Sequence, residues 1–153
     1  MKIEQNYTKE GLIRGCNKAI ISSANCILNQ KWDAYQNVAT QELIGDLKEE
    51  LDAKTETQRN NLQFILNQAL DEDNLTQTIL VSSLFTGDNI FKLEEKSKVS
   101  FHTAFVSYIS NAKDKKNPLY CNIGLSRTVS PLGKWKITGI NFFDNDFALN
   151  NSF

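Results

Sequence analysis

The period of the hydrophobic pattern changes halfway along the chain, and no other feature limits the fold as much. Between residues 12 and 70, apolar residues recur every three or four positions, which is typical of amphipathic helices. Between residues 76 and 143, β-branched and aromatic residues dominate short runs that Gly, Asn, Asp or Pro separates, which is typical of strands. Helices followed by strands predict an α+β fold, with N-terminal helices packed on an antiparallel sheet.

The first half of the sequence predicts four helices. The first spans residues 12–28, where apolar or small residues recur at intervals of four. A short helix over 32–39 and a longer one over 40–54 follow, with Thr40 as the N-cap of the longer one. The stretch 57–70 predicts the fourth helix, although Asn60 and Asn61 leave its start open.

The second half predicts a sheet of about four strands. The loop 111–118 joins the two longest runs as a hairpin. The strand-like runs are 76–85, 90–96, 97–110, 119–130 and 134–143.

The apolar residues of this half fall on both faces of the strands. In the last run, Trp135 and Ile137 alternate on one face, whereas Ile140 and Phe142 alternate on the other. A surface strand of an ordinary antiparallel sheet carries polar residues on one face. We therefore expect a strongly curved, cone-shaped sheet that wraps around a space between itself and the helices, as one domain over residues 1–153.

The charge balance limits the classes of partner. The chain has 17 Lys and Arg against 18 Asp and Glu, a formal net charge of −1, so no overall field attracts nucleic acid or an anionic membrane. No apolar run is long enough to predict a transmembrane span. We therefore expect protein partners and no nucleic acid contact, and peripheral membrane contact stays open.

The cysteines and the N-terminal residues bear on the compartment. Cys16, Cys26 and Cys121 are odd in number and show no metal-binding spacing, so we expect reduced thiols in a compartment that is not oxidising. The first eleven residues, MKIEQNYTKEG, do not resemble a signal peptide. These features predict a cytosolic protein, a mature form, or one imported without a standard presequence.

No group of residues in the sequence predicts catalysis, a metal site or a cofactor. His102 has no acidic residue two positions away to orient it, and we interpret it as a half-exposed strand residue. The acidic run 71–73 lacks the spacing and the glycine of a calcium loop and fits a solvated loop. Arg127 is a polar insertion on the strand face of its apolar neighbours. The candidates for lining an apolar cavity are Phe101, Phe105, Leu125, Trp135 and Ile137.

Four stretches together resemble a known family. They are EGLIRGCNKAI at 10–20, NQKWDAYQNVATQELIGDLKEEL at 29–51, TILVSSLFTGDNIFKLEEKSKVSFHTAFVSYIS at 78–110 and GKWKITGINF at 133–142. Their order is similar to that of the mitochondrial import-motor C-terminal domain family, within the nuclear-transport-factor-two-like superfamily. The resemblance implies a cone-shaped α+β domain in the mitochondrial matrix, peripheral to the inner membrane.

The resemblance also implies a function. A non-enzymatic protein-interaction module is expected, as a subunit or assembly factor of an inner-membrane or ribosomal complex, with protein transport as one such role. The superfamily also includes small enzymes of the isomerase and dehydratase type, so fold alone does not select among functions. Two alternatives therefore remain, a carrier of a small hydrophobic molecule and a small enzyme that uses the cavity.

Overall fold

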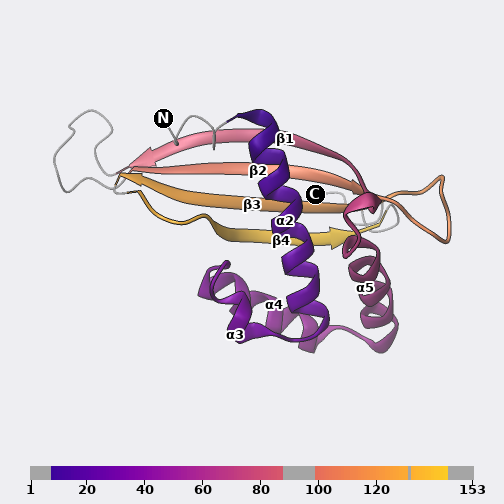
Figure 1. Cartoon of the computed structure of the whole chain (residues 1–153). Coiled ribbons are helices and arrows are strands. Elements are labelled where there is room, and N and C mark those ends of the chain that lie inside the picture. The colour runs from indigo at the N-terminus through magenta and orange to yellow at the C-terminus, as the bar shows by residue number, and fades with distance from the viewer. Residues whose placement is uncertain (1–7, 88–98, 131, 145–153) are drawn as a thin grey trace.

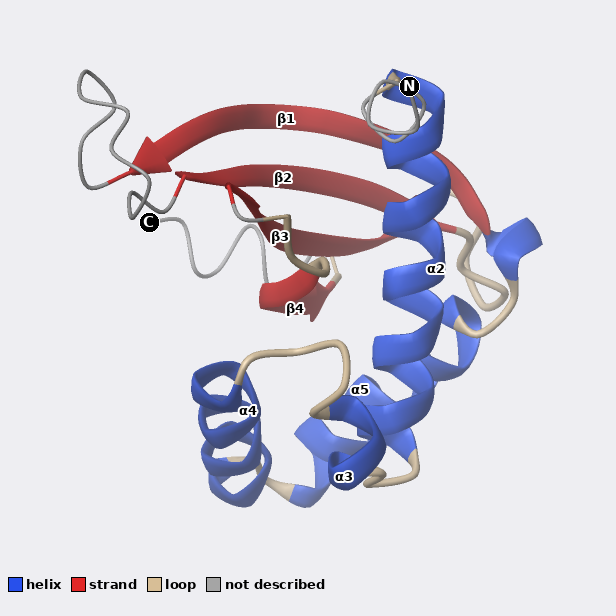
Figure 2. Cartoon of the chain, turned by 60° about the vertical axis from the view of Figure 1, so that its left-hand side comes forward, coloured by secondary structure: helices blue, strands red, loops and turns tan. Residues whose placement is uncertain are grey.

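A four-stranded antiparallel sheet carries a layer of helices on one of its faces (Figures 1 and 2). The computed structural model of the chain describes residues 8–87, 99–130 and 132–144. The expected α+β class is confirmed, with helices before strands. The elements are α2 Lys9–Leu28, α3 Trp32–Tyr35, α4 Gln41–Ala53, α5 Glu56–Ala69, the 3₁₀ helix η1 Glu72–Asn74, β1 Leu75–Gly87, β2 Val99–Ile109, β3 Leu119–Ser130 and β4 Lys136–Phe143.

Threonine side chains begin the three long helices. The hydroxyl of Thr8 accepts a hydrogen bond from the backbone N–H of the residue three positions on, at the start of α2. Thr40 does the same for α4, as expected. Thr55 caps α5 in a capping box with Gln58, and the helix begins at Glu56, one residue before the predicted stretch. Each cap satisfies a backbone donor that the first helical turn cannot.

The strands follow the chain in the order β1-β2-β3-β4, and every neighbouring pair is antiparallel. Side chains of β2 alternate between the core and the opposite face, as expected. The strand-like run expected at 90–96 lies outside the described residues. Among the described residues, no helix covers the face of the sheet that lies away from α2. The sheet bends only moderately, so the strong curvature expected from the sequence is not seen.

A β-bulge corrects the expectation for the last strand. Leu125 on β3 pairs with Ile137, and Ile123, two residues earlier, pairs with Ile140, three residues after Ile137. The extra residue turns the strand, so Ile140 and Phe142 face the same side as Ile137. The expectation that these residues occupy opposite faces is therefore wrong.

The helices bury the inner face of the sheet in two parts. Helix α2 crosses the sheet and contacts β1 and β3, whereas α4 and α5 pack beside β4 (Figure 1). Residues 38–40 also cover part of the β4 edge, because the Ile137 N–H donates to the Val38 carbonyl at 2.7 Å and the Thr40 N–H donates to the Ile137 carbonyl at 3.0 Å. None of the described helices has the length and hydropathy to cross a membrane.

Candidate functional site

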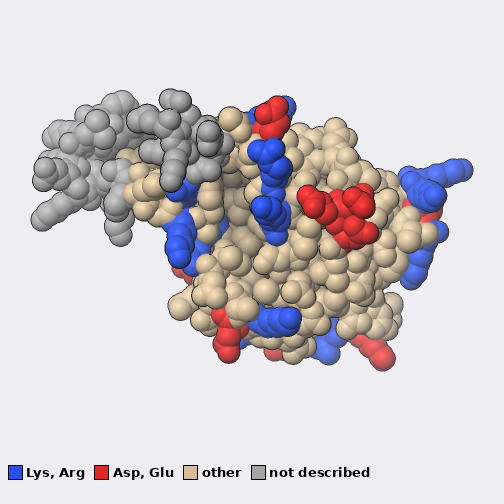
Figure 3. Space-filling view, in the orientation of Figure 1, with Lys and Arg blue, Asp and Glu red and all other residues tan. Residues whose placement is uncertain are grey.

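A cleft of about 630 Å³ lies between α2 and the β3–β4 half of the sheet. Figure 3 shows basic side chains along α2 beside a hollow in the surface. Leu125, Trp135 and Ile137 form the apolar floor of the cleft, and Leu12 of α2 and Val38 add apolar side chains to its lining. Its volume falls within the range of sites that bind small molecules, roughly 300 to 1,000 Å³.

Three of the five residues expected to line a cavity line this cleft. They are Leu125, Trp135 and Ile137. Phe105 lies instead in the packed core, at 1% exposure. Phe101 lies between the rings of Phe85 and Trp135, with centroids 4.7 Å and 6.0 Å away. All five share the inner face of the sheet, but α2 leaves space only over its β3–β4 part.

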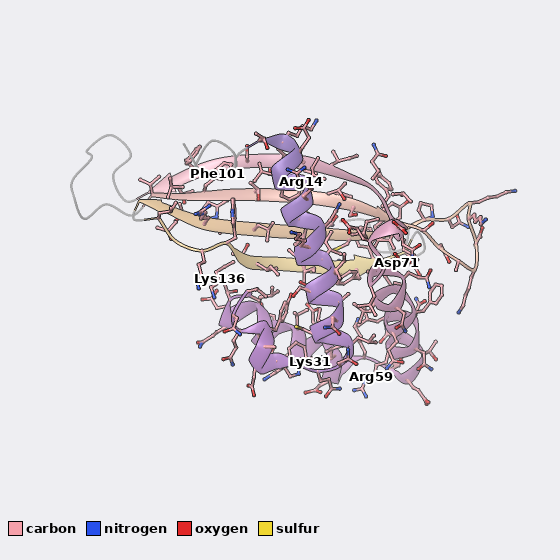
Figure 4. The ribbon with its side chains drawn as sticks, in the orientation of Figure 1. Arg14, Lys31, Arg59, Asp71, Phe101 and Lys136 are labelled. Carbon is pink, nitrogen blue, oxygen red and sulfur yellow. The ribbon has the colours of Figure 1, made fainter. Side chains whose placement is uncertain are left out.

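The α2 wall of the cleft carries small residues and two cations that the sequence analysis did not assign to a site. Gly11, Gly15, Ala19 and Ser22 line the cleft along one face of the helix. Arg14 and Lys18 line it too, one helical turn apart. Figure 4 shows Arg14 on the part of α2 that crosses the sheet, with Phe101 to its left.

Gly15 has no role in helix packing that the structure reveals. It lies in the interior of α2, where glycine costs about 1 kcal/mol relative to alanine. A Cβ atom at this position meets no heavy atom within 4 Å, so close packing does not require a glycine. Gly15 lines the cleft, so it leaves free the space that a side chain at this position would occupy.

Arg127 contacts Gly133 and the Trp135 ring at one end of the cleft. Its Nε donates to the Gly133 carbonyl at 2.7 Å, and its guanidinium lies 5.9 Å from the centre of the Trp135 ring. A hydrogen bond from the Gly133 N–H to the Thr128 carbonyl, at 2.8 Å, supports the same turn. These contacts fix the position of the Trp135 ring on the floor of the cleft.

A second cleft, of about 660 Å³, lies between the α4–α5 pair and β4. Its lining includes charges of both signs, with Glu50 and Lys54 from the α4 side and Asp144 after β4. The Asn61 side chain donates to Asp144 at 3.1 Å. Glu50 is exposed, and Asp144 is half-buried.

His102 lies on the face of the sheet away from the helices. Its Nε2 lies 2.7 Å from the Thr86 hydroxyl, and its Nδ1 is hydrogen-bonded to the Ser126 hydroxyl. The histidine thus links β1, β2 and β3 through hydroxyl groups, and no described carboxylate contacts it. It is half-buried, and it does not line the α2 cleft.

The acidic run and the cysteines occupy positions that folding explains. The Asp71 carboxylate accepts the Asp73 N–H at 3.0 Å and caps η1. Within the described part of the chain, no group of three His, Cys, Asp or Glu side chains could hold a metal ion. Burial raises the pKa of the Cys16 thiol to about 12 and that of the Cys121 thiol well above its usual value. Such thiols are poor nucleophiles at neutral pH.

A second surface follows β1, an edge strand of the sheet. Its thirteen residues, LTQTILVSSLFTG, include no charged side chain. Four of its large apolar side chains are exposed: Ile79 at 39%, Val81 at 60%, Leu84 at 51% and Phe85 at 55%. We call these four residues the β1 surface, in which Ile79 and Leu84 lie on the face away from the helices and Phe85 lies on the helix-facing side, stacked on Phe101.

Comparison of the chain with protein-family models, with curated proteins and with solved structures finds no match.

Proposed function

We propose that the chain is a non-enzymatic protein-interaction module that binds an extended segment of a partner protein along β1. The observation that carries this proposal is the exposure of four large apolar side chains on an uncharged edge strand. Proteins usually protect such edges with charged residues, proline or a covering element, because an open edge pairs with other chains. Exposed apolar surface at an edge is therefore typical of a binding site.

The two edges of the sheet differ in a way that supports β1 as the binding edge. Residues 38–40 form backbone hydrogen bonds with β4 at Ile137, and α4 and α5 pack beside that strand. Among the described elements, β1 has a neighbouring strand on one side only, β2. A partner strand added to β1 can form backbone hydrogen bonds while its alternate side chains contact Ile79 and Leu84.

The sequence resemblance supports a more specific setting for this module. The setting we propose is the mitochondrial matrix, peripheral to the inner membrane, with the chain as a subunit or assembly factor of an inner-membrane or ribosomal complex. The comparisons add nothing to this part of the proposal. Subcellular fractionation of a tagged chain tests it, and recovery outside mitochondria contradicts it.

The enzyme alternative gains no support from the α2 cleft. Enolisation by an isomerase or dehydratase needs a group that accepts a proton from the bound substrate. The described residues that line this cleft include no Asp, Glu, His or Tyr. The available polar side chains are Arg14, Lys18, Ser22 and the Trp135 indole.

The experiment compares two doubly substituted chains that gain the same charge. Val81→Lys with Leu84→Lys places two cations on the β1 surface, at side chains that are 60% and 51% exposed. Gln63→Lys with Asn67→Lys places two on the exposed side of α5. Tagged wild-type and variant chains are purified from the source cells, and the co-purifying proteins are quantified. We expect the β1 variant to lose a specific partner at least tenfold and the α5 variant to retain it.

Hydrogen exchange on the purified complex tests the mode of binding. Pairing of a strand with β1 should slow exchange of β1 amides that are open in the free chain. Equal recovery of every partner with both variants contradicts the proposal. So does sedimentation of the wild type as a dimer that the β1 variant abolishes, because the edge then binds a second copy of the chain.

A further inference from the structure

We propose that the cleft between α2 and β3–β4 binds a single-chain amphipathic anion, an acyl chain that ends in a carboxylate. The acyl chain lies on the floor formed by Leu125, Trp135 and Ile137, and the carboxylate lies at Arg14 and Lys18. This site is separate from the β1 surface, and the inference does not rest on the proposed protein-interaction function.

The apolar floor selects the hydrophobic part of the ligand. Leu125 and Ile137 belong to the core cluster and are nearly buried, at 7% and 2% exposure, while the half-buried Trp135 ring borders the space above them. An acyl chain in the cleft removes its own apolar area and the exposed part of the Trp135 ring from water, which favours binding, while Leu125 and Ile137 are already buried and add van der Waals contact. A volume of about 630 Å³ accommodates one chain of moderate length.

The two cations select the charge of the ligand. Arg14 and Lys18 repel each other across one helical turn, and neither forms an ion pair with a carboxylate of the described residues. Within the described part of the chain, no residue of the cleft lining is Asp or Glu. A carboxylate placed between the two cations relieves their repulsion, whereas a neutral ligand leaves it and a cationic ligand increases it.

Gly15, one of two glycines of α2 that line the cleft, leaves room for a ligand beside the helix. Gly15 destabilises the helix interior, and no neighbouring atom requires its small size. Any larger side chain at this position extends into the cleft. Gly45, in the interior of α4, has equally open surroundings, so what sets Gly15 apart is its place in the lining of the cleft.

The ligand class is tested with three probes that share one twelve-carbon chain. Dodecanoate, dodecanol and dodecyltrimethylammonium are titrated separately, below their micelle concentrations, while the fluorescence of the tryptophans is recorded. We expect dodecanoate to bind at least tenfold more tightly than dodecanol and the ammonium probe to bind more weakly still. Equal affinities for the three probes overturn the proposal, as does tighter binding of the ammonium probe.

Two pairs of variants test the position of the site. Gly15→Leu fills the cleft and should reduce dodecanoate affinity at least tenfold, while Gly45→Leu, also in a helix interior with open space around it, should leave the affinity unchanged. Both changes favour the helix, so both should raise the midpoint of thermal unfolding, which shows that the variants fold.

A second pair of variants tests the charge. Arg14→Gln with Lys18→Gln should weaken dodecanoate binding until its affinity equals that of dodecanol, whereas Lys115→Gln, in an exposed loop, should leave dodecanoate affinity unchanged. Binding by Gly15→Leu equal to wild type overturns the proposal.

Discussion

The hydrogen bond between Tyr35 and Ser23 joins α3 to α2 inside the core. The Tyr35 hydroxyl donates to the Ser23 hydroxyl at 2.8 Å, and both side chains are fully buried. Tyr35→Phe removes the donor and should lower the free energy of unfolding by about 1 to 2 kcal/mol. Urea denaturation measures the loss. A double-mutant cycle with Ser23→Ala should give a coupling energy of about 1 kcal/mol, and purely additive single losses contradict a direct bond.

At the residue scale, the sequence identified the apolar floor of the cleft better than its α2 wall. Alternation along the strands was enough to place Leu125 and Trp135 among the cavity candidates, because strand side chains alternate between faces. It also selected Phe101 and Phe105, since the pattern does not show where α2 crosses the sheet. The sequence did not predict a role for Gly15, because the space beside a glycine is known only from the folded structure.

At the element scale, the start of α5 depends on one capping box. The Thr55 hydroxyl accepts the Gln58 N–H at 3.2 Å, and the Gln58 side chain accepts the Thr55 N–H at 2.9 Å. Thr55→Ala should lower the free energy of unfolding by about 1 kcal/mol. Thr57→Ala, two residues later and exposed, should change it by less than about 0.5 kcal/mol. Equal losses in chemical denaturation contradict a capping role.

The elements that the sequence placed incorrectly are those that depend on a single inserted residue or on distant contacts. The pattern T-E-T-Q, residues 55–58, contains the capping signal, which the search for apolar periodicity did not use. The bulge in β4 leaves no mark in the hydrophobic pattern, so Ile140 and Phe142 were assigned to the wrong face. The pairing of residues 38–40 with β4 joins segments about a hundred residues apart, beyond any local pattern.

At the scale of the whole molecule, the order of the elements predicted the α+β class, because an amphipathic helix and a half-apolar sheet must cover each other. The curvature of the sheet was not predictable in the same way. It depends on strand twist and on bulges, and the sheet contains register shifts in all three strand pairs. Apolar residues in both sets of alternate strand positions indicate that both sets are buried. A bulge buries both by turning them to the same face of the sheet, so strong curvature is not required.

The buried acids of the core predict how the whole molecule responds to alkaline solution. Burial raises the pKa of Cys16 from 9.0 to about 12, and burial despite the hydrogen bond with Ser23 raises that of Tyr35 from 10.0 to about 12. The pKa of Cys121 is also raised, by burial and by the nearby Cys16. Below pH 9 these groups keep their protons in both the folded and the unfolded chain, so they add no pH dependence.

Between pH 9 and about pH 12 the unfolded chain releases these protons first, so the free energy of unfolding falls as the pH rises. Each group lowers it by about 1.4 kcal/mol per pH unit within its own window. Urea denaturation at a series of pH values from 7 to 11 measures the slope. Cys16→Ala removes one of the groups and should make the decline above pH 9 shallower by about that amount. An unchanged slope in this variant contradicts the assignment, even if the substitution also lowers stability at pH 7.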